Sequence, residues 1–415
     1  MMKRYIFLLI AAVFTAAGAR PATPLTIDSC LTAVMDGNIA LAAEKLNLSV
    51  AEAEVRASHI FNDPSLGVEY ANNDDHRMQM GQGVSVELGY TFTPGRRGAA
   101  IDLAKSEAQL ERALFDDYVR NLKYEASAAY FEAVKALRLY QLALSFSDSM
   151  DRIARGDSLG LAIGEIREVD AMSTRIEARL ARADARQALA DYNDAMLNLA
   201  VLMGNPSLAD QFEPVSDTLP MVLPEVDDAT LIESALDRRA DLRAALKNVD
   251  VAAKALTVAG RERNLEFEVA LGYNYNTEVR NELAPAPKFS GMTIGVTIPL
   301  KFSNHNKGAV NAARFRKQQA EQQYAQARIE IESDVLSSLR GFRTSLDQLQ
   351  SLDSTTLVES EKIYNSYLDA YSHGDVSLVE LLEVRRNYED IQKLHVESQC
   401  ATSTAYVRLQ AALGL

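Results

Sequence analysis

Two distant segments of the chain repeat one pattern of apolar and polar positions. Residues 84–98 read VSVELGYTFTPGRRG, and residues 294–308 read IGVTIPLKFSNHNKG. In each segment apolar and polar residues alternate up to a phenylalanine, and a short polar turn, a basic residue and a glycine follow. Alternation with a period of two predicts a β-strand that is apolar on one face and polar on the other.

Two more segments alternate in the same way and complete two hairpins, at about residues 64–93 and 265–302. The alternation is strong over residues 266–275 and weaker over residues 66–70. Alternating segments of about ten residues with terminal aromatic side chains are typical of outer-membrane β-barrels. A half-buried sheet in a soluble protein shows the same alternation, so this pattern alone leaves both alternatives open.

A long helical pattern follows each hairpin, at about residues 98–203 and 307–413. Proline is absent from residues 95–205 and from residue 300 to the end, as long helices require. The stretch from 98 to 154 alone would form a helix about 85 Å long. A helix of this length cannot bury itself in a compact globule, which predicts side-by-side packing in a coiled coil or a barrel wall.

The chain carries one structural unit twice. With an offset of 210 positions, Gly164-Glu165-Ile166 matches Gly374-Asp375-Val376, and the strand segments match as well. Before the strands the offset is 201, so the missing nine residues fall between the two strands of each unit. The predicted organisation is a first repeat at 20–204, a proline-containing linker at 205–227 and a second repeat at 228–415.

The first residues predict export. Lys3 and Arg4 precede an apolar run, and Ala17-Gly18-Ala19 has the form of a signal-peptidase site. We interpret residues 1–19 as a secretory signal peptide. Downstream, no apolar run approaches the length of about 20 residues that a membrane-spanning helix needs. If the exported protein lies in a membrane, its strands must span that membrane.

Composition narrows the classes of function. The formal net charge of -14 argues against a nucleic-acid partner, because nucleic acid requires a basic surface. Cys30 and Cys400 permit one bridge in an oxidising compartment, but two free thiols are the favoured interpretation. Tryptophan is absent, so tyrosine and phenylalanine must supply any aromatic belt at a membrane interface.

Four strands per chain predict an oligomer. About eight strands are the smallest number that closes a barrel in lipid. An open sheet edge in hydrocarbon leaves backbone groups unpaired, and each unpaired group costs several kcal/mol. Three chains would supply about twelve strands, which is enough for closure. The segment that ends each hairpin would then mark the point where a strand leaves the membrane and a periplasmic helix begins.

Four motifs carry a resemblance to a known family. They are TFTPGRRG and KFSNHNKG after the hairpins, ALDRRADLRAA at the start of the second repeat, and YSHGDVSLVELLEVR at the second helix tip. With the duplicated unit, they make the chain resemble the TolC family of outer-membrane efflux proteins, nearer its CzcC/CusC-like heavy-metal branch, over essentially the whole mature chain. The family's NP-L motif appears as Asn38-Ile39-Ala40-Leu41, without the proline.

The resemblance implies a mainly α-helical fold with transmembrane β-strands. Three chains of such a homotrimer share one outer-membrane barrel above a long helical tunnel through the periplasm of a Gram-negative bacterium. The implied function is a passive exit duct of a tripartite efflux pump. The implied partners are a periplasmic adaptor protein, an inner-membrane transporter of the RND or a related type, and outer-membrane lipid. Metal ions, drugs and secreted proteins all stay open as cargo.

The sequence contains no constellation for catalysis. The histidines form no HExxH pair, and neither a CxxC pair nor a phosphate-binding loop occurs. We therefore expect no enzyme activity, no cofactor and no metal site. One outer loop carries potential metal ligands, but a mobile exposed loop is the favoured interpretation. These residues are Asp74, Asp75, His76, Met78 and Met80.

Two matching helix turns form the candidate gate. They contain Gly164, Glu165, Gly374 and Asp375. Three chains would place these acids around the narrowest opening of the tunnel, and charged rings select and gate in channels. A purely structural role in helix capping is the alternative, because Ser377 with Glu380 fits a capping box and Gly374 suits a left-handed turn.

The polar face of the strands would line the barrel lumen. It carries the candidate lumen residues Glu69, Glu87, Glu266 and Glu268. Such carboxylates could favour cations, but polar lumens are ordinary, so plain solvation is the simpler interpretation.

A trimeric surface adhesin is the main alternative from another class, because it also builds twelve strands from four per chain. An adhesin would place its strands together at the C-terminus, whereas here two separate hairpins each precede long helices. A type I protein-secretion exit channel is the alternative within the duct class.

Overall fold

The computed structural model describes residues 23–75, 78–215, 227–300, 306–352 and 354–415. The predicted signal peptide, His76, part of the predicted linker and most of the KFSNHNKG junction lie outside these residues. The chain forms two compact units, each assembled from segments that are distant in sequence. Unit 1 contains residues 1–39, 123–223 and 341–407, and unit 2 contains residues 40–122, 224–340 and 408–415.

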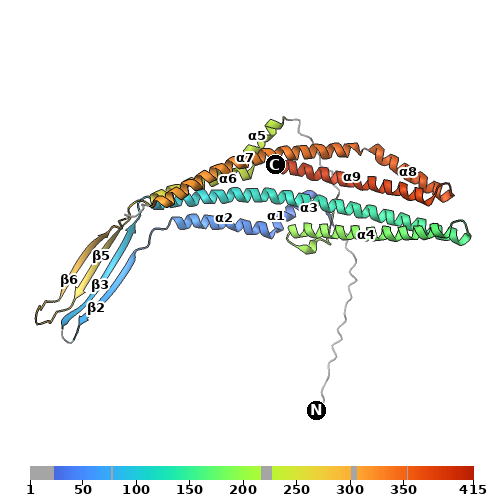
Figure 1. Cartoon of the computed structure of the whole chain (residues 1–415). Helices are drawn as coiled ribbons and strands as arrows, with labels where there is room; N and C mark the ends of the chain where they lie inside the picture. Colours follow the sequence, from blue (N-terminus) through green and yellow to red (C-terminus); the bar gives the residue numbers. More distant parts are fainter. Residues whose placement is uncertain (1–22, 76–77, 216–226, 301–305, 353) are drawn as a thin grey trace, which may run out of the picture. The chain divides into compact units, whose positions relative to one another are not determined.

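Unit 2 contains a four-stranded antiparallel sheet (Figure 1). Its strands are β2 (Ser65–Asp74), β3 (Gln79–Phe92), β5 (Phe267–Asn276) and β6 (Phe289–Thr297). The order in the sheet is β2-β3-β5-β6, so the two hairpins join through β3 and β5. A mainly helical chain with these four strands confirms the predicted fold class, and β2 and β6 remain as the two edges.

The register gives the sheet two chemically different faces. On one face an apolar row crosses all four strands, formed by Leu66, Leu88, Leu271 and Ile294. On the other face a neighbouring row contains Gly67, Glu87, Gly272 and Thr293. The apolar face is uncovered in the described chain, since Leu66 is 68% exposed and Ile294 is 74% exposed. An uncovered apolar face of this kind requires a second apolar phase or another protein.

Helices make up the rest of unit 2. They are α2 (Ile39–Ser58), α5 (Asp228–Arg238) and α6 (Ala240–Arg261), the first parts of α3 (Arg96–Ile163) and α7 (Lys307–Ser351), and the end of α9 (Leu378–Leu413). The α3 helix alone has 68 residues. Its uninterrupted length is consistent with the absence of proline and with a high content of good helix formers such as alanine, leucine and glutamate.

Unit 1 is built mainly from helices with small side chains between them. It contains the other parts of α3, α7 and α9 with α1 (Ile27–Gly37), α4 (Glu168–Leu202) and α8 (Ser354–His373). Met150 and Ala154 of α3 pack with Ala178 and Ala181 of α4 in one buried cluster. Alanines at such positions let two helix axes approach closely. Cys30 and Cys400 are both buried and free, which confirms the prediction of two unpaired thiols.

A short parallel pair of strands in unit 1 was not predicted. β1 (Thr23–Leu25) pairs with β4 (Phe212–Pro214), and β4 lies in the stretch that the sequence indicated as a linker. The buried Tyr130 hydroxyl of α3 lies 2.9 Å from the carbonyl oxygen of Leu25 and 2.6 Å from that of Val215. The hydroxyl therefore ties both strands to α3, and no local pattern in three-residue strands reveals such pairing.

Element bounds recur along the chain with the same offsets as the sequence motifs. Helices α1 and α5 begin and end 201 positions apart, and the ends of α3 and α8 are 210 positions apart. Helices α4 and α9 also begin 210 positions apart. One difference is that α3 is continuous, whereas its counterpart is divided into α7 and α8 near residue 352. The spacing is unchanged across this break.

Candidate functional site

The two helix turns of unit 1 have the same backbone geometry. Gly164 and Gly374 have φ angles of 82° and 80°, which L-residues with a Cβ rarely adopt. The N–H of Glu165 donates to the carbonyl of Gly160 at 2.9 Å, and the N–H of Asp375 donates to that of Ala370 at 2.9 Å. Each turn is therefore a Schellman motif that satisfies the last carbonyls of the preceding helix.

The acids of the turns have no capping role in the described part of the chain. The carboxylate of Glu380 accepts hydrogen bonds from the backbone N–H and the hydroxyl of Ser377, both at 2.8 Å. The N–H of Glu380 donates back to the Ser377 hydroxyl at 3.4 Å, which completes the predicted capping box. The side chains of Glu165 and Asp375 are exposed, so their charges face solvent.

A hydrogen bond and negative charges at the second turn raise the pKa of a nearby histidine, His373. The pKa of His373 is raised by its hydrogen bond to the Asp369 carbonyl and by the Asp369 carboxylate, and Asp375 adds to this effect. His373 is fully exposed, so solvent and salt screen these interactions. The Asp375 carboxylate thus makes the smallest of these contributions at the turn.

A buried polar pair joins two helices close to the turns. The Tyr371 hydroxyl of α8 donates to Oδ2 of Asp157 in α3 at 3.0 Å. Asp157 is only 3% exposed, and burial raises its pKa, although hydrogen bonds from Thr174 and Tyr371 oppose the shift. Ser149 and Tyr364 form a second link between α3 and α8, at 2.9 Å. Sequence reasoning missed both pairs, because the partners in each pair lie more than two hundred positions apart in the sequence.

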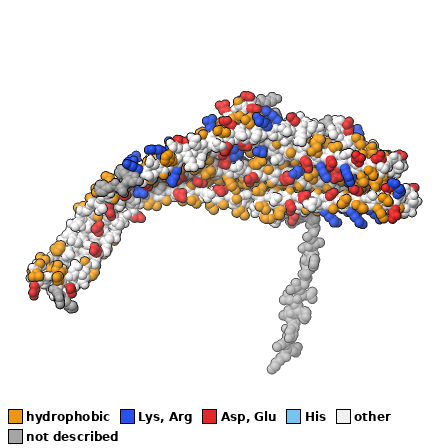
Figure 2. Space-filling model, in the orientation of Figure 1, with side chains coloured by type: hydrophobic (Ala, Val, Ile, Leu, Met, Phe, Trp, Pro, Cys, Tyr) orange, Lys and Arg blue, Asp and Glu red, His pale blue; other side chains and the backbone are white. Residues whose placement is uncertain are grey.

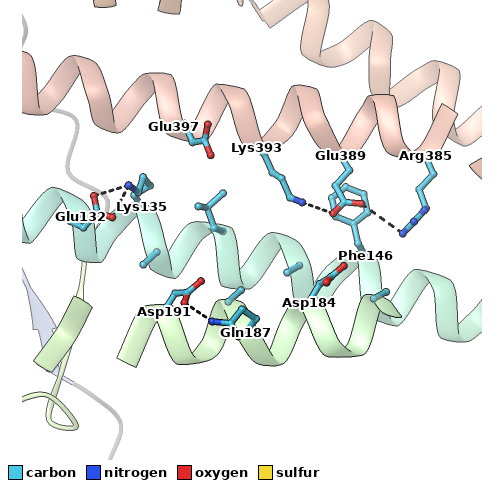
Figure 3. Close-up of a pocket in the computed structure, with 15 residues that line it drawn as sticks. Glu132, Lys135, Phe146, Asp184, Gln187, Asp191, Arg385, Glu389, Lys393 and Glu397 are labelled. Carbon is cyan, nitrogen blue, oxygen red and sulfur yellow. Dashed lines mark hydrogen bonds and ion pairs between the residues drawn. The ribbon is translucent and has the colours of Figure 1, made fainter. Parts of the chain in front are cut away.

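A charged groove of about 500 Å³ lies among α3, α4 and α9 of unit 1 (Figure 3). Glu389 accepts from Lys393 at 2.8 Å and lies 3.7 Å from Arg385. Arg385 is also 3.4 Å from Glu177 of α4. The apolar part of the lining consists of alanines together with Leu139 and Phe146. Part of the charge of these helices is therefore paired between neighbouring helices.

The register places three of the four candidate lumen glutamates on the polar face of the sheet. Glu69 stands opposite Ser85, Glu87 opposite Gly67 and Gly272, and Glu268 opposite Thr91 and Thr297. No two of these carboxylates are directly opposite each other, which avoids repulsion within the sheet. The fourth, Glu266, precedes β5 and lies 3.9 Å from Arg96 at the start of α3.

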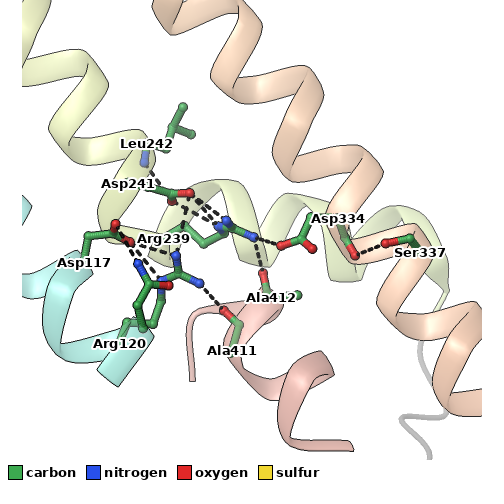
Figure 4. A network of polar contacts seen from close by, with 10 residues as sticks. Asp117, Arg120, Arg239, Asp241, Leu242, Asp334, Ser337, Ala411 and Ala412 are labelled. Atoms are coloured by element: carbon green, nitrogen blue, oxygen red, sulfur yellow. Dashed lines mark hydrogen bonds and ion pairs between the residues drawn. The ribbon is translucent and has the colours of Figure 1, made fainter. Parts of the chain in front are cut away.

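The ALDRRADLRAA motif has a role in unit 2 that the sequence did not reveal (Figure 4). Arg239 donates to Asp241 and to Asp334, each at 2.6 Å, and to the Ala412 carbonyl at 3.3 Å. Burial by itself would raise the pKa of Asp241, but Arg239, Arg120 and the N–H of Leu242 together outweigh burial and lower it. Arg120 donates to the carbonyl of Ala411 at 2.9 Å.

Two guanidinium groups therefore hold the last carbonyls of α9. A helix C-terminus carries unpaired carbonyls and partial negative charge, so cations are favourable there. The side chain of Arg239 is only 7% exposed. Because a buried charge without a partner is strongly destabilising, Arg239 requires its pairing with the two aspartates.

The outer loop of the first hairpin carries part of the potential metal ligands. Oδ1 of Asp74 accepts from the N–H of Gly81 at 2.7 Å, and the Met80 sulfur accepts from Asn281 at 3.5 Å. In the part of the chain that the structure describes, no group of three or more acidic, histidine or cysteine side chains is arranged to hold a metal ion. None of the described helices is both long and apolar enough to cross a membrane.

Comparison with known proteins supplies the family. Residues 231–415 match the family model described as outer membrane efflux protein. The cobalt-zinc-cadmium resistance protein CzcC of Cupriavidus metallidurans is 24% identical over 370 residues, which cover 88% of this chain and 84% of CzcC. The second half of the chain thus matches the outer membrane efflux protein family. The predicted family and the predicted location in the outer membrane are thereby confirmed.

Solved structures of outer membrane efflux proteins share the fold. CusC is 17% identical, with a TM-score of 0.75 over 94% of this chain and 92% of CusC. VceC of Vibrio cholerae is 16% identical, with a TM-score of 0.75 over 94% of this chain and 96% of VceC. The CmeC channel of Campylobacter jejuni is 16% identical, with a TM-score of 0.78 over 94% of this chain and 85% of CmeC. The family consists of channel proteins, as expected for a chain without a catalytic constellation.

Proposed function

We propose that this outer membrane efflux protein is the exit duct of a tripartite pump and that three copies form one channel. The observation that carries the proposal is the sheet of unit 2, which has one apolar face and two edges without a neighbour in the described chain. Lipid accepts the apolar face but does not accept the edges. Closure by three copies satisfies both conditions with about twelve strands.

The helices would form the wall of a periplasmic tunnel. Lysine and arginine lie among aspartate and glutamate on the visible face of the helices, which suits a surface in contact with water (Figure 2). Alanine-rich contacts such as those of Ala178 and Ala181 support close packing of neighbouring helices. Cargo would pass through the tunnel without chemical change, so the chain needs no catalytic residue.

A periplasmic adaptor protein and an inner-membrane transporter would deliver cargo at the helix turns. Along the chain, the turns at Gly164 and Gly374 follow the ends of α3 and α8, which belong to the long helical segments after each hairpin. Three copies would bring the exposed carboxylates of Glu165 and Asp375 together at the entrance. We propose that this acidic ring contributes to gating and selectivity.

Cations are the proposed cargo class. The name of CzcC relates that protein to resistance against cobalt, zinc and cadmium. The exposed acids at the turns and the glutamates on the polar face of the sheet favour positive charge in this chain as well. A protein-secretion channel would share the fold but pass polypeptide. An adhesin is less compatible, because each hairpin here precedes long helices and the chain ends in α9.

Cross-linking and conductance together test the duct. Chemical cross-linking of the protein in outer-membrane fractions is expected to give trimers, and the purified trimer is expected to conduct ions in planar bilayers. Recovery as a stable monomer, or from the periplasm without detergent, would contradict the proposal. A trimer that transports an unfolded polypeptide but passes no divalent cations would favour the secretion channel instead.

A further inference from the structure

A second groove lies in unit 2 where the strands meet the helices. Its volume is about 650 Å³. One side is formed by aromatic side chains at the end of β3 and the start of β5, and the other side by the segment before β2 and the first turn of α3. The residues that matter for its chemistry are Phe61, Tyr90, Phe92, Arg96, Arg97 and Phe267.

The aromatic side of the groove continues the apolar face of the sheet. Phe92 and Phe267 are opposite each other in the register and stack with ring centroids 5.2 Å apart. Tyr90, two residues earlier on the same face, contacts Phe92 edge-on at 4.6 Å. Phenylalanine and tyrosine at the end of an apolar strand face are typical of the boundary between hydrocarbon and water.

The two arginines of the groove differ in their charge balance. Arg96 lies 3.7 Å from Glu262 and 3.9 Å from Glu266, so two carboxylates offset its charge. Arg97 places its guanidinium 3.8 Å from the centre of the Phe61 ring and donates to the His59 carbonyl. No carboxylate among the described residues pairs with Arg97, and its Nε is buried without a hydrogen-bond acceptor there.

We propose that this groove binds an anionic phospholipid of the leaflet next to the helices, with the lipid phosphate on Arg97. The inference rests on the proposed function in one respect, since it requires the sheet to span the bilayer. A guanidinium matches the geometry of phosphate oxygens and is stabilised by stacking on an aromatic ring. The acyl chains would lie on Tyr90, Phe92 and the apolar face beyond them.

Charge complementarity and continuity with the lipid-facing surface favour a lipid over other occupants. This groove offers an uncompensated cation beside an aromatic rim that continues the apolar face of the sheet, which is the combination that an amphiphile with a negative head requires.

Lipid titration of the full-length trimer tests the proposal. The trimer in non-ionic detergent is titrated with phosphatidylglycerol or with phosphatidylcholine of the same acyl chains, and bound lipid is counted by native mass spectrometry. Wild type is expected to bind phosphatidylglycerol about tenfold more tightly, in keeping with a charge-assisted hydrogen bond. Arg97→Gln should abolish this preference, and Arg97→Lys should retain part of it because the charge persists.

Arg112→Gln is the matched control. Arg112 also belongs to α3 but lies outside the groove, in an exposed pair with Glu52 at 3.1 Å, so this variant should keep the preference. Equal binding of both lipids by wild type, or an unchanged preference in Arg97→Gln, would overturn the proposal. Competition by millimolar inorganic phosphate that removes the preference without acyl-chain dependence would show an anion site rather than a lipid site, and would overturn it too.

Two further measurements distinguish the lipid site from a contact between copies of the chain and from the proposed duct function. If wild type shows no lipid preference while Arg97→Gln lowers the temperature at which trimers dissociate in detergent, the groove is a contact between copies and the lipid site is rejected. Conductance of the same preparations is measured in parallel. Conducting trimers without lipid preference reject the lipid site alone, whereas trimers that bind lipid but do not conduct reject the duct alone.

Discussion

Asp375 follows a helix end, yet a different residue pair caps the next helix. Ser377 and Glu380 satisfy the first turn of α9, and Gly374 supplies the left-handed turn. The exposed carboxylate of Asp375 is thus not needed for the local fold. It makes a small contribution to the raised pKa of His373, after the larger effects of Asp369.

Replacing Asp375 by asparagine removes one charge without removing a cap. If the acid helps to select ions, Asp375→Asn should lower the preference for cations over anions in single-channel recordings, because the attraction at the entrance weakens. Trimer yield and the temperature of trimer dissociation should remain at the wild-type level.

Ser377→Ala is the matched control for this prediction. It removes the cap and should lower stability by about 1 kcal/mol while leaving ion preference unchanged. An unchanged ion preference in folded Asp375→Asn trimers would remove the gating assignment.

The Tyr371–Asp157 pair predicts a contrast between two conservative changes. Tyr371→Phe leaves the buried Asp157 carboxylate without this donor and should cost about 2 kcal/mol in unfolding free energy. Asp157→Asn still accepts from Tyr371 and removes a buried charge, so its stability at neutral pH should equal or exceed that of wild type. Thermal unfolding followed by circular dichroism measures both.

The pH dependence of the pair has a defined sign. Burial raises the pKa of Asp157, so the folded chain binds this proton more tightly than the unfolded chain does. The free energy of unfolding should therefore fall as pH rises above about 4, the ordinary Asp pKa. Asp157→Asn should lack this component of the pH profile, and an identical profile in the variant would contradict the assignment.

The sequence predicted residues that belong to the repeated unit, such as Gly374. It did not predict residues that pair between distant helices. Gly374 was predicted because a turn between long helices needs a left-handed residue, and its φ angle of 80° agrees. Asp157 and Tyr371 are separated by more than two hundred positions, so only the packing of α3 against α8 brings them together. A single sequence carries no local signal for such a contact.

At the scale of helices and strands, the sequence predicted long elements more accurately than short ones. The absence of proline and the strict alternation predicted α3, β3 and β5. The parallel pair of β1 and β4 was missed, because three residues carry no periodicity and their partner lies almost two hundred positions away. The break between α7 and α8 was missed as well, because no proline marks it.

The arginine pair at the end of α9 predicts a large effect from one substitution. Arg239→Ala leaves Asp241 and Asp334 without their shared partner and frees the Ala412 carbonyl. We expect a loss of about 3 to 5 kcal/mol in unfolding free energy, because breaking a buried ion network leaves charge uncompensated. Denaturant unfolding of the purified protein measures the change.

Arg243→Ala serves as the comparison for this network. Arg243 forms an exposed pair with Asp116 at 3.5 Å, so its loss should cost less than about 1 kcal/mol. Similar costs for the two variants would show that the network is not specifically required.

The two faces of the sheet make a prediction for the whole assembly. Val86 lies on the apolar face between Val68 and Tyr273, and Ser85 lies next to it on the polar face. Val86→Lys should reduce the yield of outer-membrane trimers, because a lysine facing lipid near mid-membrane costs about 2 to 4 kcal/mol.

Ser85→Lys should be tolerated in the same assay, because the polar face would line a water-filled lumen. Fractionation followed by electrophoresis without heating reports the trimer yield of both variants. Equal yields of the two variants would mean that the apolar face does not contact lipid.

If three copies form the channel as proposed, the edges of β2 and β6, which have no neighbour in the described chain, also link the number of channels to the rate of protein synthesis. A single chain would then have no stable place in the bilayer, and each exported copy would have to wait for two others. By mass action, complete channels then vary with the third power of the pool of waiting chains, so halving that pool lowers the number of channels about eightfold. A cell could therefore switch the pathway sharply by a small change in expression, without any ligand acting on the channel.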